Sequence, residues 1–443
     1  MEQTRVYTKM LKHLKYYLQP DCSNINIEAL NERFKNVCIF DSNSQYNSET
    51  PSQFDKLIAV GCVEEFIIND SIDLFEHLQQ FYDKRKGWLF GYITYDIKNN
   101  IEQLCSENAD KLSFPELHFF CPKVVLQINE NIVSVFYDAD FLSEKETEAI
   151  FNLCFSPPNK KSENNFYEIN IQSKITKQEY IDAVNQLKQH IRKGDIYEVN
   201  FCQEFFVEDL EMDTVSIYEK LNEISRAPFS AYCKFDKQYL LSASPERFLK
   251  KSGNKLISQP IKGTIKRAEN KLEDDALKQK LKNDAKERSE NVMIVDLVRN
   301  DLSRIASRGS VSVDQLFGIY SFKQVHQMIS TVSCKLQPIT SFTDIIKSTF
   351  PMGSMTGAPK VSAMKLIEQF ESTKRGLYSG AVGYVTPDGD FDFSVVIRSI
   401  LHNAENKYTS FMVGSAITDK ANAEQEFEEC LLKAKAMFEV LNN

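Results

Sequence analysis

The sequence lacks the features that would place the chain in a membrane or on a nucleic acid. No apolar run approaches the roughly 20 residues of a membrane-spanning helix. Residues 1–20 carry too many charges for a secretory signal. Asp and Glu number 62 against 53 Lys and Arg, a net charge of −9, so no broad basic surface for nucleic acids or anionic membranes is expected. We therefore expect a cytoplasmic protein without membrane or nucleic-acid partners.

The cysteines, histidines and glycines of the chain do not form the patterns that mark disulfide, zinc or phosphate-binding sites. The 10 cysteines are scattered without a CxxC pair, which indicates reduced thiols. The 6 histidines form neither HxxxH nor HExxH, so a zinc site is not expected. The segment FPMGSMTGAPK (350–360) lacks the spacing of a P-loop. Cys62 is not followed by a Gly–x–Gly elbow, so it resembles a buried structural cysteine more than a glutaminase nucleophile.

The composition indicates a folded globular protein of 443 residues, with 42% hydrophobic and 26% charged residues. Alternating or apolar runs between turn signals predict strands in the first 155 residues, at 36–43, 56–68, 88–97 and 123–138. The polar stretch 156–165 is the best linker candidate. We therefore divide the chain into an amino-terminal region (1–160) and a second domain (175–440).

Helix signals in the second region are fewer than strand signals. A one-sided apolar pattern predicts a helix from Thr176 that ends at Gly194. Further helices are expected from Asp284 and from near Asn422. Many strand candidates follow one another without an intervening helix. This favours an α+β fold with large, mostly antiparallel sheets covered by helices.

Two of these helix starts carry pairs of glutamates about one turn apart. Asp284 and Glu287 have capping-box spacing, and Glu290 follows one turn later. Glu426 and Glu429 repeat the arrangement near the carboxyl terminus. A solvated helix face is the ordinary explanation. Glu290, however, opens a nearly continuous apolar run, where a carboxylate is costly unless a hard cation such as Mg²⁺ compensates it.

Polar side chains also lie beside predicted turns. Glu246 follows a proline at a strand end, and Lys262 lies in a Pro–Ile–Lys–Gly–Thr turn after another strand. Gly263 would let the backbone approach a ligand, although a surface lysine at a turn is the simpler explanation of Lys262. Segment 350–360 is either a structural helix start or a source of backbone N–H groups for a carboxylate. His326 is by default a buried, hydrogen-bonded histidine.

Six segments occur in the order found in chorismate-utilising enzymes. They are PIKGT, KERSENVMIVDLVRNDL, FPMGSMTGAPK, RGLYSGAVGYV, VVIRS and EQEFEECLLKAK. The chain therefore resembles this family, and within it the large components of the aminodeoxychorismate and anthranilate synthases. The six segments lie within 175–440, which the resemblance implies to be the chorismate-binding catalytic domain. Residues 1–155 resemble the family's amino-terminal part only through FDSN and GYITYD. The resemblance implies two sheets packed as a sandwich, with helices outside and the active site between them.

The resemblance also implies the ligands. The substrate would be chorismate, a dicarboxylate dianion, and Mg²⁺ would let an acidic site bind it. Glu290 and Glu429 correspond to family metal ligands, with Glu287 and Glu426 supporting through water. The implied substrate contacts are Gly263, His326, Thr356, Tyr378, Arg398, Gly414 and Lys433.

Position 262 favours the aminodeoxychorismate branch, which carries Lys there, whereas anthranilate synthases usually carry Ala. Isochorismate and salicylate synthases use a lysine base where this chain has Glu198, and Asn200 also resembles the aminodeoxychorismate branch. The implied reaction is Mg²⁺-dependent amination of chorismate to 4-amino-4-deoxychorismate in para-aminobenzoate and folate biosynthesis. It would use a covalent Lys262 intermediate and Glu246 as general acid. Lys262 must then be neutral, so its pKa must fall from about 10.4.

Two alternative functions stay open, and the chain departs from the family pattern at two positions. His326 matches a family histidine, which leaves room for anthranilate synthase component I chemistry. A non-catalytic chorismate-binding partner of a glutaminase is opposed by the intact set of reactive groups. Glu198 replaces a more usual Gln, and Ala416 replaces the second glycine of a Gly-x-Gly run. No segment resembles an amidotransferase, so ammonia is expected from a separate glutaminase subunit, in a heterodimer, or from ammonium salts.

Overall fold

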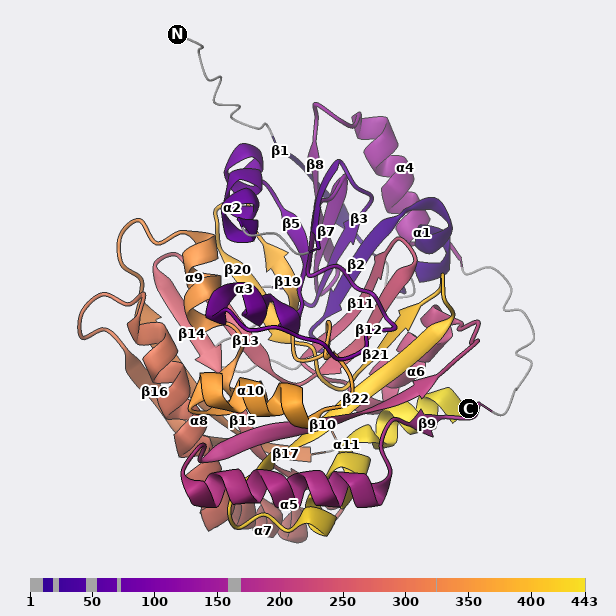
Figure 1. Cartoon of the computed structure of the whole chain (residues 1–443). Coiled ribbons are helices and arrows are strands. Elements are labelled where there is room, and N and C mark those ends of the chain that lie inside the picture. The colour runs from indigo at the N-terminus through magenta and orange to yellow at the C-terminus, as the bar shows by residue number, and fades with distance from the viewer. Residues whose placement is uncertain are drawn as a thin grey trace.

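A computed structural model describes residues 11–18, 24–44, 54–69, 73–157, 169–323 and 325–442 (Figure 1). Its described strands form two large sheets, and the pairs within both sheets are antiparallel. The linker candidate at 156–165 lies almost wholly outside the described residues. Among the described helices, none is long and apolar enough to cross a membrane.

The larger sheet has 12 described strands and takes them from both regions of the chain. In spatial order they are β1 (Leu11–Tyr17), β8 (Ile132–Asp138), β7 (Val124–Asn129), β3 (Lys56–Val60), β2 (Asn36–Asp41), β11 (Phe229–Phe235), β12 (Gln238–Ser244), β21 (Ser399–Asn403), β22 (Tyr408–Ile417), β10 (Glu198–Val207) and β18 (Gly357–Ala358), with β9 (Gln172–Ser173) beside β10. The two regions meet where β2 pairs with β11, so the larger sheet continues across the division between 1–160 and 175–440.

The smaller sheet has 10 described strands and also joins both regions, through the pairing of β5 with β19. In order these strands are β15 (Ile261–Lys266), β17 (Val325–Lys335), β14 (Lys255–Gln259), β13 (Arg247–Ser252), β20 (Phe391–Val395), β19 (Ala381–Val385), β5 (Leu89–Ile93), β6 (Leu117–Cys121) and β4 (Glu64–Ile68), with β16 (Ser312–Ser321) beside β17.

Helices pack against the outer faces of the two sheets (Figure 1). They are α1 (Ile27–Arg33), α2 (Leu74–Arg85), α3 (Lys98–Glu102), α4 (Glu144–Cys154), α5 (Lys177–Lys193), α6 (Thr214–Ser225), α7 (Lys271–Asn283), α8 (Ala285–Ser303), α9 (Phe342–Thr349), α10 (Lys360–Phe370) and α11 (Ala423–Asn442), with short 3₁₀ turns η1 (Tyr95–Ile97) and η2 (Gly353–Met355).

The core consists of two layers separated by the larger sheet. Strand β2 shows the arrangement, since its side chains alternate between the layers. Val37 and Ile39 pack with α1, α4, α5 and α11, while Cys38 and Phe40 pack between the two sheets. Because both faces of β2 are covered, every residue of this strand is buried. The predicted α+β sandwich with outer helices is confirmed.

Candidate active site

The site is built where strands β10 and β15 come close to the first turns of α8 and α11. Helix α8 packs on β15 and β17, and α11 packs on β22, which pairs with β10. Asp284 caps α8 by accepting hydrogen bonds from the backbone N–H groups of Lys286 and Glu287. Asn422 does the same for α11 through the N–H groups of Glu424 and Gln425. Each cap fixes where its helix begins and thereby which turns carry the glutamates.

Glu246 lies between β12 and β13, as predicted for a strand end, and only 4% of it is exposed. Ser354 of η2 donates a 2.6 Å hydrogen bond to its Oε1 atom. Burial raises the pKa of Glu246 to about 7, although Ser354 and Lys262 favour the charged form. A carboxyl with this pKa is partly protonated at neutral pH and can serve as a general acid.

Lys262, whose charge acts on Glu246, forms a buried ion pair with Glu198. Its Nζ atom is 2.9 Å from Oε1 of Glu198, at the start of β10. Glu198 is 1% exposed, and its Oε2 atom has no hydrogen-bond partner among the described residues. Burial lowers the pKa of Lys262, but the charges of Glu198 and Glu290 outweigh burial and raise it overall. The fall in pKa that a neutral Lys262 requires is therefore not found in this arrangement, because the partner carboxylate of Glu198 stabilises the protonated amine.

Lys262 is part of a strand rather than a turn, which corrects the sequence analysis. Strand β15 begins at Ile261, directly after Pro260, and its register against β17 shifts between Ile261 and Thr264. Gly263 occupies this irregularity with φ of 91°, a conformation that favours glycine. A Cβ atom at this position would lie 3.1 Å from Oε2 of Glu287. The glycine therefore lets β15 approach the glutamates of α8.

Two of the four predicted metal ligands, Glu290 and Glu426, lie beside Lys286, a residue not predicted to be functional. Nζ of Lys286 lies 3.1 Å from Oε1 of Glu426 and 3.9 Å from Oε1 of Glu290. The charge of Glu429 also raises the pKa of Lys286. The pKa of Glu287 is raised by the charge of Glu429 and lowered by that of Lys286. Burial raises the pKa of Glu290 to about 7 and raises that of Glu287 as well. The Lys286 ammonium is thus the cation beside Glu426 and Glu290 in this arrangement.

The same carboxylates are a chemically suitable but not converged set for Mg²⁺. Nowhere in the described ranges do three or more His, Cys, Asp or Glu side chains gather as metal ligands. Oε1 of Glu290 is buried without a hydrogen-bond partner among the described residues, which leaves it available to a cation. Carboxylate oxygens are the ligands that Mg²⁺ prefers. The donor chemistry fits, and binding would require these side chains to turn from Lys286 toward one point.

Arg398, a predicted substrate contact, lies within electrostatic range of Glu429 and of Tyr378, a second predicted contact. The Arg398 guanidinium makes no hydrogen bond within the described part of the chain. Burial lowers the pKa of Arg398, although the charges of Tyr378 and Glu429 act in the opposite direction. Tyr378 is buried, with its hydroxyl 3.7 Å from the Cys202 thiol. An uncommitted, partly buried guanidinium matches the predicted role of Arg398 in binding a carboxylate.

Lys433 and Thr356 have polar partners within the protein. Nζ of Lys433 lies 2.7 Å from Glu429 and donates to the Gly414 carbonyl at 3.0 Å. Despite burial, Lys433 holds the pKa of Glu429 below its usual value. The buried Thr356 hydroxyl donates to the Met352 carbonyl at 3.2 Å. The Lys433 contact joins α11 to β22, whereas the Thr356 hydrogen bond stays within the loop before β18.

His326 differs from these residues because both of its ring nitrogens are engaged. Nε2 lies 2.9 Å from Asp274 of α7, and Nδ1 lies 2.9 Å from the Ser321 hydroxyl. The residue is fully buried. These contacts match the default expectation of a core histidine, and the structure leaves its ring without a free hydrogen-bonding atom for substrate.

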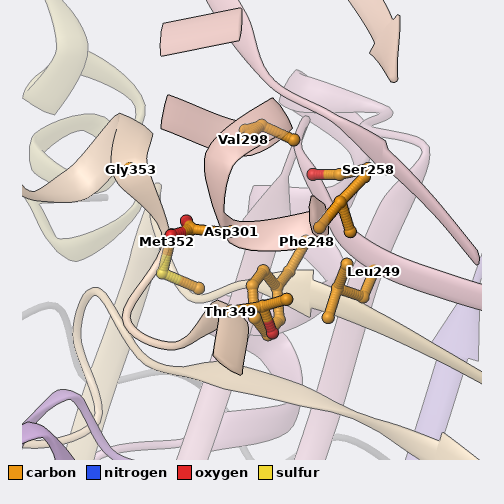
Figure 2. Close-up of a pocket in the computed structure, with 9 residues that line it drawn as sticks. Phe248, Leu249, Ser258, Val298, Asp301, Thr349, Met352 and Gly353 are labelled. Atoms are coloured by element: carbon orange, nitrogen blue, oxygen red, sulfur yellow. The ribbon is translucent and has the colours of Figure 1, made fainter. Parts of the chain in front are cut away.

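A small cavity lies beside the site rather than in it (Figure 2). Val298 and Asp301 of α8 line it with residues of β13, and Gly353 of η2 closes it. Its volume of about 10 Å³ leaves room for about one water molecule, so it cannot hold chorismate. Because Gly353 precedes Ser354, the cavity lies behind the loop that contacts Glu246.

Three contacts of the site could not be read from the sequence. Glu198 stood out only as an unusual charge, and Ser354 and Lys286 were not singled out as functional. Ser354 lies within the segment 350–360, whose glycines gave a partial signal. The other signal was the ordered set of family motifs, in which Lys286 directly precedes Glu287.

Comparisons with known proteins show which family this chain resembles. The family model described as chorismate binding enzyme matches residues 30–439. Aminodeoxychorismate synthase component 1 of Salmonella typhimurium is 38% identical over 368 residues, 81% of this chain and 77% of that protein. The rice (Oryza sativa subsp. japonica) protein named "Probable aminodeoxychorismate synthase, chloroplastic" is 35% identical over 391 residues, 80% of this chain but only 43% of that protein.

A solved structure extends the match to the fold. Anthranilate synthase component I from Streptococcus pneumoniae TIGR4 aligns with a TM-score of 0.77 and 26% identity, covering 88% of this chain and 92% of that chain. The family model spans both sheets, from α1 to α11. The resemblance seen in the ordered motifs is thereby confirmed. The chain belongs to the family of chorismate binding enzymes.

Proposed function

We propose that this enzyme aminates chorismate to 4-amino-4-deoxychorismate, in the cytoplasm, as a step toward para-aminobenzoate and folate. The observation that carries the proposal is the buried Lys262 amine, which is paired with Glu198 and influenced by the acid Glu246. Relatives named aminodeoxychorismate synthase component 1 support amination and a second component. We assign that component to a separate glutaminase subunit that supplies ammonia.

In the first step, Lys262 must lose a proton before it can attack. Glu198 is its hydrogen-bond partner and has a second, unpartnered oxygen, so we assign it as the proton acceptor. The neutral amine forms a bond to ring carbon 2 of chorismate. The ring double bonds shift, and the bond from carbon 4 to its hydroxyl breaks. Glu246 protonates that hydroxyl, which leaves as water.

In the second step, ammonia forms a bond to carbon 4, and the bond between carbon 2 and Lys262 breaks. Lys262, which the first step left as a secondary ammonium, departs as the neutral amine and takes back the proton that Glu198 accepted. The ammonium formed on carbon 4 passes one proton to Glu246, which restores the acid. Each step inverts the face of the ring, so the amino group ends on the face from which the hydroxyl left. The overall reaction converts chorismate and ammonia to 4-amino-4-deoxychorismate and water.

Metal and substrate binding are assigned to the groups around Lys286. Glu290 and Glu429 would hold Mg²⁺ directly, with Glu287 and Glu426 acting through water. Bound there, Mg²⁺ would offset the negative charge of the carboxylates and attract the ring carboxylate of chorismate. The remaining contacts are assigned to side chains or backbone of Gly263, Thr356, Tyr378, Arg398, Gly414 and Lys433.

Product identity tests this assignment. Purified protein, chorismate, Mg²⁺ and an ammonium salt should yield 4-amino-4-deoxychorismate, which gives para-aminobenzoate only after a lyase is added. Excess chelator should abolish turnover, and Lys262→Ala should remove amination. Fluorescent anthranilate formed without a lyase would contradict the proposal, and absence of any product would favour the non-catalytic partner.

Anthranilate synthase chemistry is the second candidate, because the matched Streptococcus pneumoniae structure is an anthranilate synthase component I. Lys262 argues against it, since the resemblance associates Ala with that branch. In addition, both ring nitrogens of His326, the residue that kept this reading open, are held by Asp274 and Ser321.

A further inference from the structure

A second buried ion pair, between Arg375 and Glu371, lies under the site, and neither of its members has a role in the proposed reaction. Arg375 belongs to the RGLYSG segment between α10 and β19, and Glu371 follows α10 directly. Arg375 is 2% exposed and Glu371 is 5% exposed. The two side chains form a bidentate pair, with Nε to Oε2 at 2.9 Å and Nη2 to Oε1 at 2.6 Å.

All five N–H donors of Arg375 have an acceptor. Besides the two bonds to Glu371, Nη1 donates to the Met355 carbonyl at 2.7 Å and to the Ser379 hydroxyl at 3.2 Å. Nη2 also donates to the Asn200 carbonyl at 2.8 Å. Because an ammonium offers only three donors from one point, lysine cannot reproduce this planar set.

These bonds join two segments that each carry one partner of a proposed catalytic group. Asn200 lies on β10, two residues after the Lys262 partner Glu198. Met355 directly follows Ser354, the hydroxyl that contacts Glu246. Glu371 strengthens the link because its Oε1 accepts from the backbone N–H of Cys202 on β10 at 2.9 Å.

A backbone hydrogen bond also joins the same two segments directly. The N–H of Asn200 donates to the Thr356 carbonyl at 2.8 Å. The guanidinium of Arg375 therefore supports a junction at which β10 and the loop before β18 already touch. On its other side it lies 4.6 Å from the ring centre of Tyr95, which limits its movement.

We propose that Arg375 is a positioning residue that fixes strand β10 and the loop before β18 relative to each other. It thereby sets where Glu198 meets the reacting amine and where Ser354 meets the acid. The inference rests on the proposed function, since it assumes that the amine and the acid act in one reaction.

The test compares Arg375→Lys and Arg375→Ala with a matched surface control, Arg192→Lys. Arg192 is 65% exposed and pairs with Asp419 at 3.0 Å, remote in role from the site. For each variant, kcat and the KM for chorismate are measured with saturating ammonium, and folding is checked by circular dichroism. We expect kcat of folded Arg375→Lys to fall on the order of 100-fold, with KM changed by less than about threefold.

Chemical rescue provides a readout that a purely structural role would not move. Added guanidinium ion at non-denaturing concentration should restore part of the kcat of folded Arg375→Ala and leave Arg192→Lys unchanged. Wild-type kcat in folded Arg375→Lys, a loss confined to KM, or failure of both variants to fold would overturn the proposal. The proposed function is tested separately, by the identity of the product that the wild-type protein forms. The positioning role is tested by the ratio of variant to wild-type kcat for that same product.

Discussion

At the scale of single residues, Lys262 meets two opposing influences. Burial favours its neutral amine, whereas Glu198 and Glu290 favour the ammonium, and their charges prevail. A nucleophile can therefore be prepared by transferring its proton to an adjacent base instead of by a standing low pKa. In this chain Glu198, at 2.9 Å, is placed to be that base.

Glu246 gives a prediction about pH. Its pKa of about 7 lies above the usual value for a carboxyl, and a general acid acts only while protonated. We therefore expect kcat, measured at constant free ammonia, to decrease as pH rises through about 7. Glu246→Gln should lower kcat by about 10²–10⁴-fold and remove this decrease. If the variant keeps both the rate and the pH dependence of wild type, Glu246 is not the acid.

Lys286 gives a prediction about metal affinity. Its ammonium is bound by the carboxylates assigned to Mg²⁺, and two cations compete for the same oxygens. Because the lysine side chain is 43% exposed, solvent weakens the competition. Lys286→Gln should bind Mg²⁺ on the order of tenfold more tightly in calorimetric titration. Lys177→Gln, which removes a different lysine paired with α11, should leave the Mg²⁺ affinity unchanged. Equal affinities in wild type and both variants would contradict the assignment.

Sequence reasoning found the residue types of the site but not their pairing. Lys262 and Glu198 are 64 residues apart, and Ser354 and Glu246 are 108 apart. No local pattern encodes contacts of this range, since they depend on how the two sheets are placed. The glutamates drew attention because they follow readable helix starts, and their role as metal ligands stays a prediction from the family resemblance.

At the scale of elements, helix starts were predictable and one strand was not. Thr176, Asp284 and Asn422 each begin a helix as predicted, because a side-chain acceptor there bonds to first-turn N–H groups. Lys262 was placed in a turn because Pro260 and Gly263 are turn residues. Pairing with β17 overrides that local preference and converts the turn into an irregular strand.

The cap of α8 provides a test at this scale. Asp284→Ala removes the acceptor for two N–H groups and should lower the free energy of unfolding by about 0.5–2 kcal/mol. It should also weaken Mg²⁺ binding, because Glu287 and Glu290 follow on the first turns. Ser143→Ala removes the comparable cap of α4. In urea titrations both variants should lose stability, and only Asp284→Ala should lose metal affinity; a loss of affinity in Ser143→Ala as well would refute the specific role.

At the scale of the whole molecule, the division at 160–175 separates sequence regions but not sheets. Strand β11 pairs with β2, and β19 pairs with β5, so both sheets cross this division. The linker-like composition of 156–165 predicted a boundary in the chain, but the pairing of distant strands could not be deduced from composition. Strands of the catalytic region thus depend on the amino-terminal region for their neighbours.

A fragment that starts at residue 175 should therefore not fold on its own. It would expose one edge of β11 and one edge of β19, together with apolar side chains of the layer between the sheets. We expect it to aggregate or to lack a cooperative thermal transition by circular dichroism. A soluble fragment with a cooperative transition and chorismate binding would mean that the catalytic region is independent.

The covalent step is tested most directly by the mass of the protein after incubation with chorismate and Mg²⁺ in the absence of ammonia. We predict an adduct of one chorismate less one water, located by peptide mapping on Lys262, absent from Lys262→Ala, and discharged as 4-amino-4-deoxychorismate when ammonium is added. An adduct on another residue, or none in an enzyme that aminates chorismate normally, would contradict the account.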